Sequence, residues 1–158
     1  MCALVDTSVF HRVLRRNRDS HFYPIQDAFF GRSRNRQILI YGGVVFDREI
    51  RKDKEAASRL RELDSAGNAR RIPTADIEKQ IEDIKKAKTC KSNDPHIIAL
   101  ARLSGARVLC SYDGNLIADF TNAALLSPKG RVFKKPSHRH VLSKQCKGRC
   151  GGPNQCKQ

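Results

Sequence analysis

Short apolar runs alternate along the chain with stretches in which apolar residues recur every three or four positions. Turn-forming or charged residues close each run, a pattern that predicts buried β-strands. The predicted strands cover residues 2–5, 37–41, 107–111 and 131–133, with a short edge segment at 70–73. Because helical stretches separate successive strands, we expect the strands to pair in parallel.

Helical periodicity fills the intervals between the predicted strands. We expect helices over residues 9–16, 45–63, 74–88, 95–104 and 115–121. Thr74 is a favourable N-cap for the third helix, and Asp94 followed by Pro95 is a favourable start for the fourth. Gly105 ends the fourth helix. Residues 17–36 mix polar and aromatic side chains, and we expect them to pack in part as a helix or lid.

This order of elements predicts an α/β domain with a central, mostly parallel sheet and right-handed crossovers. The 158 residues suit one domain with a substantial core. Acidic residues and long apolar runs cease near Lys135. We therefore assign residues 1–135 to the domain and residues 136–158 to a basic C-terminal tail that contains His and Cys.

Basic residues outnumber acidic ones, with 31 Lys and Arg against 16 Asp and Glu and a net charge of +15. Such a chain attracts polyanions, chiefly nucleic acid, although the same charge also suits a solvated surface or attraction to a membrane surface. No apolar run approaches the roughly 18 residues that span a membrane, and the first residues lack the pattern of a secretory signal. We expect a cytoplasmic protein that does not enter a membrane.

Three acidic residues fall where strands end or a helix begins: Asp6, Asp94 and Asp113. In open α/β sheets the carboxyl edge of the strands is where ligands bind. Two carboxylates at about 4 Å repel by about 4 kcal/mol at an effective dielectric near 20. A divalent cation with oxygen ligands removes that repulsion. The alternative is that Asp94 is only an N-cap and that the other two form turns.

The segments that carry these acids resemble those of the PIN-domain nucleases. They are ALVDTSVF, NDPHIIALARLSGARVLCS and SYDGNLIADF, with Asp94 and Asp113 separated by 19 residues. The resemblance runs from Ala3 to about Phe133 and implies a three-layer α/β/α sandwich. It also implies a fourth acid on the helix after the second strand, which matches Glu49 in YGGVVFDREI.

The resemblance implies that the acids hold one or two Mg²⁺ or Mn²⁺ ions, which activate water and stabilise charge on phosphorus. The implied metal ligands are Asp6, Asp94 and Asp113, with Glu49 as a ligand or as the residue that positions the water. Asp119 is either a further ligand or a surface residue. We expect hydroxyl groups to support these acids through hydrogen bonds, from Thr7, Ser8 and Ser111.

Basic side chains near the acids suggest contacts with phosphate. Arg12, Arg15 and Arg16 follow the first acid, and Lys134 and Lys135 follow the last predicted strand. Their function would be to bind the nucleic-acid backbone. The alternative is a solvated helix face.

The tail carries a second set of potential metal ligands. His138, His140, Cys146, Cys150 and Cys156 supply the residue types that bind Zn²⁺, without a tight two-residue cysteine spacing. The alternative is a basic tail rich in Gly and Pro that holds RNA nonspecifically.

Taken together, the residues and the resemblance predict a metal-dependent endoribonuclease that cleaves RNA phosphodiester bonds. Many PIN-domain relatives are VapC-type toxins that a small antitoxin keeps silent, and many form homodimers. Other hypotheses are an RNA-processing or defence nuclease without an antitoxin, and a non-catalytic nucleic-acid-binding module. A Mg²⁺-dependent phosphatase or phosphotransferase is disfavoured, because such enzymes often carry Asp-x-Asp after the first strand and Ser8 occupies the second of these positions.

Overall fold

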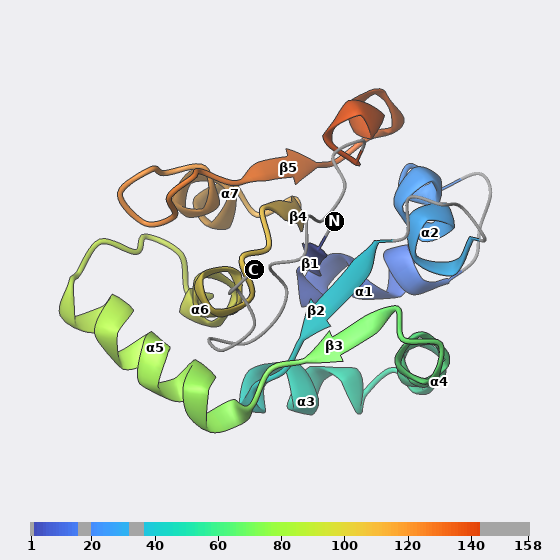
Figure 1. Ribbon diagram of the computed structural model, residues 1–158, viewed down its shortest axis with the longest axis horizontal. Helices are drawn as coiled ribbons and strands as arrows, with labels where there is room; N and C mark the ends of the chain where they lie inside the picture. Colours follow the sequence, from blue (N-terminus) through green and yellow to red (C-terminus); the bar gives the residue numbers. More distant parts are fainter. Residues whose placement is uncertain (1, 16–19, 32–36, 143–158) are drawn as a thin grey trace, which may run out of the picture.

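The computed structural model describes residues 2–15, 20–31 and 37–142. Its central sheet has five strands in the order β3-β2-β1-β4-β5, and every pairing is parallel (Figure 1). The strands are β1 (Cys2–Val5), β2 (Ile38–Tyr41), β3 (Ala69–Arg71), β4 (Val108–Cys110) and β5 (Arg131–Phe133). The predicted parallel α/β sheet is confirmed.

The central strand β1 contributes side chains to two separate cores because successive side chains point to opposite faces of the sheet. Ala3 and Val5 belong to one core, and Cys2 and Leu4 belong to the other. The register pairs Ala3 with Leu39 of β2 on one side and with Val108 of β4 on the other. All four β1 side chains are at most 3% exposed, as expected for a strand covered on both faces.

Helices cover both faces and complete a three-layer α/β/α sandwich (Figure 1). The first core packs against α1 (Thr7–Leu14), α2 (Tyr23–Phe30), α3 (Val44–Ile50), α4 (Lys54–Ser65) and the 3-10 helix η1 (Pro136–Leu142). The second core packs against α5 (Thr74–Lys86), α6 (Pro95–Ser104) and α7 (Gly114–Phe120). Apolar side chains at helical spacing form these buried faces, for example Ile77, Ile81 and Ile84 on α5.

Two details of the predicted helices are wrong. The expected helix over residues 45–63 is two helices, because Asp53 has an extended backbone and its carboxylate accepts a hydrogen bond from the Ala56 amide at 3.0 Å. This N-cap starts a new helix although the apolar stripe continues across it. Thr74 does not cap α5 but is its first residue, and Pro73 occupies the N-cap without a side-chain hydrogen bond.

The segment that the sequence left unplaced contains α2, which begins with Pro24 in its first turn. The described part of the tail also packs on the domain. Val141 and Leu142 of η1 join the first core, and the side-chain nitrogen of Gln37 (Nε2) donates to the Leu142 carbonyl at 3.2 Å. No helix in the described part of the chain combines the length and the apolarity needed to cross a membrane.

Candidate active site

The candidate site lies where the strand order reverses. After β1 the chain builds β2 and β3 on one side, and it then returns to build β4 and β5 on the other side. Asp6 follows β1 directly, and Asp113 follows β4 after two residues. The Asp6 amide donates to the Cys110 carbonyl at 2.9 Å, which extends the ladder to this edge. Ligands bind at such switch points in open parallel sheets because the diverging loops leave a crevice there.

Asp6 is held rigidly by hydroxyl groups. Its side chain is buried, and its Oδ2 accepts from the Ser8 and Ser111 hydroxyl groups, each at 2.7 Å. The Ser8 amide donates to the other oxygen at 3.2 Å, so Asp6 is also the N-cap of α1. These contacts fix the direction in which the carboxylate faces.

Ser111 links the loops after β1 and β4. While its hydroxyl donates to Asp6, its Oγ accepts from the Asp113 amide at 2.9 Å. Asp113 in turn caps α7, because its Oδ1 accepts from the Leu116 amide at 2.6 Å. One buried hydroxyl therefore sets the spacing between two of the acidic residues.

We expect the Ser111→Ala variant to lose about 2 kcal/mol of unfolding free energy in urea denaturation, because a buried hydrogen bond to a carboxylate is removed. Ser8→Ala is the matched control. It removes the other hydroxyl from the same Asp6 oxygen, but Ser8 is exposed and water takes its place. An equal loss of unfolding free energy in both variants would show that Ser111 stabilises Asp6 no more than the exposed Ser8 does.

Asp94 is the N-cap residue of α6, yet its side chain makes no capping hydrogen bond. Burial raises the pKa of the Asp94 carboxyl above its ordinary value, and the negative charges of Asp6, Asp113 and Glu49 raise it further. His96 acts in the opposite direction. Asp94 therefore lies close enough to Asp6, Asp113 and Glu49 to experience their charges, and the capping alternative does not account for it.

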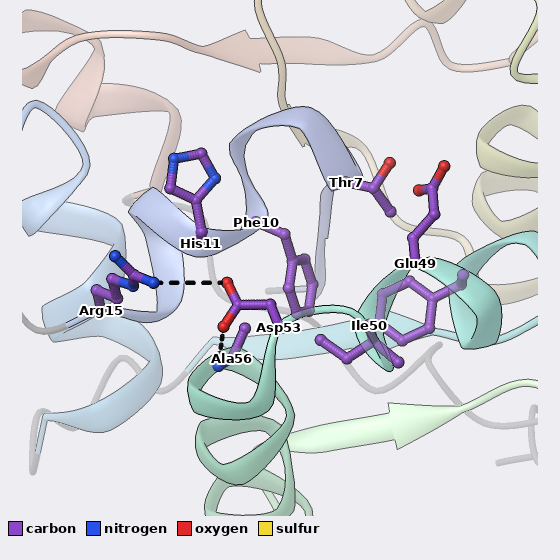
Figure 2. Close-up of a pocket in the computed structure, with 9 residues that line it drawn as sticks. Thr7, Phe10, His11, Arg15, Glu49, Ile50, Asp53 and Ala56 are labelled. Carbon is purple, nitrogen blue, oxygen red and sulfur yellow. Dashed lines mark hydrogen bonds and ion pairs between the residues drawn. The ribbon is translucent and has the colours of Figure 1, made fainter.

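Glu49 reaches this edge from α3. Its Oε2 is buried and has no hydrogen-bond partner among the described residues. Figure 2 shows that the Glu49 carboxylate and the Thr7 hydroxyl project toward the same end of a pocket of about 210 Å³, with Phe10 forming part of its apolar wall. A buried carboxylate oxygen without a donor is costly, which is typical of a group that awaits a ligand.

His96 is a site residue that the sequence analysis did not select. It is 4% exposed, its Nδ1 lies 3.8 Å from Asp94 Oδ1, and its Nε2 has no partner among the described residues. Burial lowers the pKa of His96, against the opposite effect of the negative charges of Asp94, Glu49 and Asp6. Its position two residues after Asp94, on the helix that this acid starts, was the signal available in the sequence.

Asp119 has a different environment from the other four acids. It is 1% exposed, so the predicted alternative of a surface position is wrong. Its carboxylate accepts hydrogen bonds from the Ser92 amide at 2.7 Å, the Lys91 amide at 2.8 Å and the Cys90 thiol at 3.1 Å. Burial alone would raise the pKa of Asp119, but these hydrogen bonds outweigh it and lower the pKa. The contacts favour a role in holding the loop that leads to Asp94 over metal ligation.

The basic side chains that were predicted to contact phosphate differ in whether they already pair with a carboxylate. Arg12 is exposed and pairs with no carboxylate in residues 2–15, 20–31 or 37–142. The Arg15 guanidinium instead pairs with Glu55 at 3.0 Å and with Asp53 at 3.9 Å. Arg16 lies outside the described residues. Lys134 and Lys135 follow β5 at the same edge of the sheet.

The predicted zinc ligands are only partly described. His138 and His140 lie on η1 with ring centroids 6.3 Å apart, and His138 Nδ1 lies 3.1 Å from the Val132 carbonyl oxygen. Cys146, Cys150 and Cys156 lie outside the described residues. Zinc binding by the tail therefore stays a prediction.

The donor chemistry of the acidic edge fits a hard divalent cation. Asp6, Glu49, Asp94 and Asp113 supply oxygen atoms, which Mg²⁺ and Mn²⁺ prefer, and no Lys or Arg of the described chain neutralises them. As the described side chains stand, no three His, Cys, Asp or Glu residues are close enough to enclose a metal ion. The four acids form an open set rather than a closed cage.

The fold and this edge define a class of protein, a parallel α/β sandwich with carboxylates at its switch point. A family model described as PIN domain matches residues 3–120, and the chain belongs to the PIN-domain family. No curated protein and no solved structure matches the chain significantly. PIN domains are generally nucleases, which act on nucleic acids and typically use divalent metal ions.

Proposed function

We propose that this protein is a metal-dependent endoribonuclease. The observation that carries the proposal is the state of Asp94, a carboxyl group that makes no capping bond and whose pKa is raised by burial and by three other carboxylates. An arrangement that costs folding energy in this way is typical of a functional site. The positive charge of the chain supports RNA as the partner, since a polyanion must approach an acidic site.

In this proposal Asp6, Asp94, Asp113 and Glu49 would hold Mg²⁺ or Mn²⁺. The cation would supply a water of lowered pKa and would stabilise the charge that develops on phosphorus. The chain's own contribution is orientation. Ser8 and Ser111 hold Asp6 by hydrogen bonds of 2.7 Å, and Glu49 has a buried oxygen that no donor of the described residues reaches.

We expect the purified protein to cleave a mixed pool of single-stranded RNA in the presence of Mn²⁺ or Mg²⁺, and we expect excess EDTA to stop cleavage. Mn²⁺ should also raise the thermal midpoint of the protein in the absence of RNA, because binding to the native state alone stabilises it by mass action. Gel analysis of the RNA and differential scanning fluorimetry provide the two readouts. Cleavage that EDTA leaves unchanged would contradict the role of the metal.

A non-catalytic nucleic-acid-binding module is the second candidate, because Asp6 and Asp113 do make the capping hydrogen bonds that this alternative requires. It predicts RNA binding without cleavage and no rise of the thermal midpoint with Mn²⁺. The same two measurements therefore separate the two functions.

We extend the first proposal to a cytoplasmic toxin of the VapC type, kept silent by a small antitoxin and assembled as a homodimer. The support is the resemblance of the acidic segments to those of VapC-like ribonucleases. A short open reading frame directly upstream of the gene is the expected finding. Its product should co-purify with the protein and suppress cleavage.

A further inference from the structure

A second hollow, of about 340 Å³, lies beside the candidate site next to the pocket of Figure 2, with which it shares His11 and Arg15. We call it the Tyr112 groove. Its lining comes from α1 and the residue after it, from the turn before α2 and from the loop after β4, and it includes His11, Arg12, Arg15, His21, Phe22 and Tyr112. Nothing in the proposed metal chemistry uses this groove, although Tyr112 lies between Ser111 and Asp113 in the chain.

Tyr112 presents an aromatic ring to solvent in a fixed position. The residue is 44% exposed. Its hydroxyl donates to the Lys134 carbonyl at 3.3 Å. The ring packs against that of Phe22 with centroids 5.6 Å apart, and Phe22 is itself 1% exposed. Contacts at both ends therefore hold the ring before any ligand arrives, which lowers the entropic cost of binding.

Among the described residues, the His and Arg side chains that line the Tyr112 groove are His11, Arg12, Arg15 and His21. No Asp or Glu of the described chain lines it, whereas the pocket of Figure 2 is lined by Glu49 and Asp53. Arg12 and His21 are exposed. The groove thus combines an aromatic ring with cationic and hydrogen-bonding groups, and Tyr112 directly precedes Asp113 in the chain.

We infer that the Tyr112 groove binds an unpaired nucleotide next to the phosphate that is cleaved. The base stacks on the Tyr112 ring, and Arg12 and His21 contact its phosphate. Aromatic rings bind single-stranded nucleic acid in this way because every base offers a π-face, while basic side chains follow the backbone. A base in a duplex is already stacked and paired, so the groove selects single-stranded RNA. This inference rests on the proposed function, since it takes the acidic edge as the place of cleavage.

The test is the affinity for a fluorescein-labelled 12-nucleotide single-stranded RNA, measured by anisotropy in EDTA so that no cleavage occurs. We expect Tyr112→Ala to weaken binding about 10-fold, in line with the loss of one stacked base. Tyr112→Phe keeps the ring and should bind within about 2-fold of the wild type. Tyr23→Ala is the matched control. Tyr23 is 37% exposed and lies outside the groove, and its loss should leave the affinity unchanged.

The same RNA as a blunt duplex should bind wild type and Tyr112→Ala equally. The inference is overturned if Tyr112→Ala binds the single strand as tightly as the wild type, if Tyr23→Ala weakens binding as much, or if the wild type does not bind the RNA. Equal weakening for single strand and duplex also overturns it. Thermal midpoints confirm that each variant is folded.

Cleavage of the unlabelled RNA with Mn²⁺ is measured in parallel. If the wild type cleaves RNA but Tyr112→Ala binds it as tightly as the wild type, the nuclease proposal stands and the proposed role of the groove is refuted. If Tyr112→Ala binds RNA more weakly but the wild type does not cleave it, the groove is a nucleotide-binding surface and the nuclease proposal is refuted. The two failures are therefore distinguishable.

Discussion

Replacing Asp94 with asparagine should reduce RNA cleavage at least about 100-fold and, in EDTA, raise the thermal midpoint of the protein. The loss of activity follows from the proposed role in metal binding, which supplies several kcal/mol of transition-state stabilisation. The gain in stability follows from burial and from the repulsion by Asp6, Asp113 and Glu49 that the charged side chain experiences. Because Asp94 is 35% exposed, solvent screening limits the gain to about 2 °C.

The dependence of this gain on pH has a definite sign. A raised pKa in the folded state means that the native protein disfavours the charged form of Asp94, so the penalty is present at neutral pH and disappears as pH falls through the raised pKa. The difference in midpoint between the variant and the wild type should therefore shrink on acidification. Addition of Mn²⁺ should stabilise the wild type more than the variant.

Asp83→Asn, at an exposed position on α5, is the matched control for charge removal and should change neither activity nor midpoint. Differential scanning fluorimetry between pH 4 and pH 8 and a gel assay of RNA cleavage give the two readouts. If the Asp94→Asn variant cleaves RNA as fast as the wild type, the catalytic assignment is refuted. A lower midpoint in EDTA would refute the repulsion between the acids.

The largest loss of stability should come from Asp119→Ala, at about 3 kcal/mol of unfolding free energy. The substitution leaves the Lys91 and Ser92 amides without the buried carboxylate that accepts from both. Because the pKa of Asp119 is lowered in the folded state, its contribution is present at neutral pH and is lost as pH falls through that lowered value. The wild type should therefore lose stability in acid more steeply than the variant.

Urea denaturation at several pH values below pH 7 measures this difference, with Asp83→Ala as the control at an exposed acid. Asp119→Asn separates a structural role from metal ligation. A residue that only holds the loop should destabilise the protein when changed to Asn and leave the Mn²⁺ dependence of cleavage unchanged. A weaker response to Mn²⁺ without loss of stability would restore Asp119 as a ligand.

The strands and most helices were predictable because their signals are local. A buried parallel strand is an apolar run, and an amphipathic helix repeats its apolar positions. The break between α3 and α4 was not predictable from that stripe, since Phe46 and Leu60 pack on the same core from two helices. Only the capping geometry of Asp53 shows where the second helix begins.

The candidate site divides in the same way. Asp6, Asp94 and Asp113 were selected from strand ends and a helix start, which a sequence shows directly. The contacts that distinguish Asp119 from them join residues 27 to 29 positions apart in the chain. The Ser111 hydroxyl reaches across 105 positions to Asp6. Such pairings depend on the packed structure, and no local sequence pattern predicts them.

The central position of β1 has a consequence for the protein during its synthesis. β1 is translated well before its partner β4, which ends at Cys110, and Asp113 follows that strand. A growing chain on the ribosome therefore carries Asp6 and Glu49 long before it can hold them beside Asp94 and Asp113. In the proposed function, an enzyme built in this order cannot cut its own messenger until Asp113 has been translated, because the site needs the non-local pairing of β1 with β4.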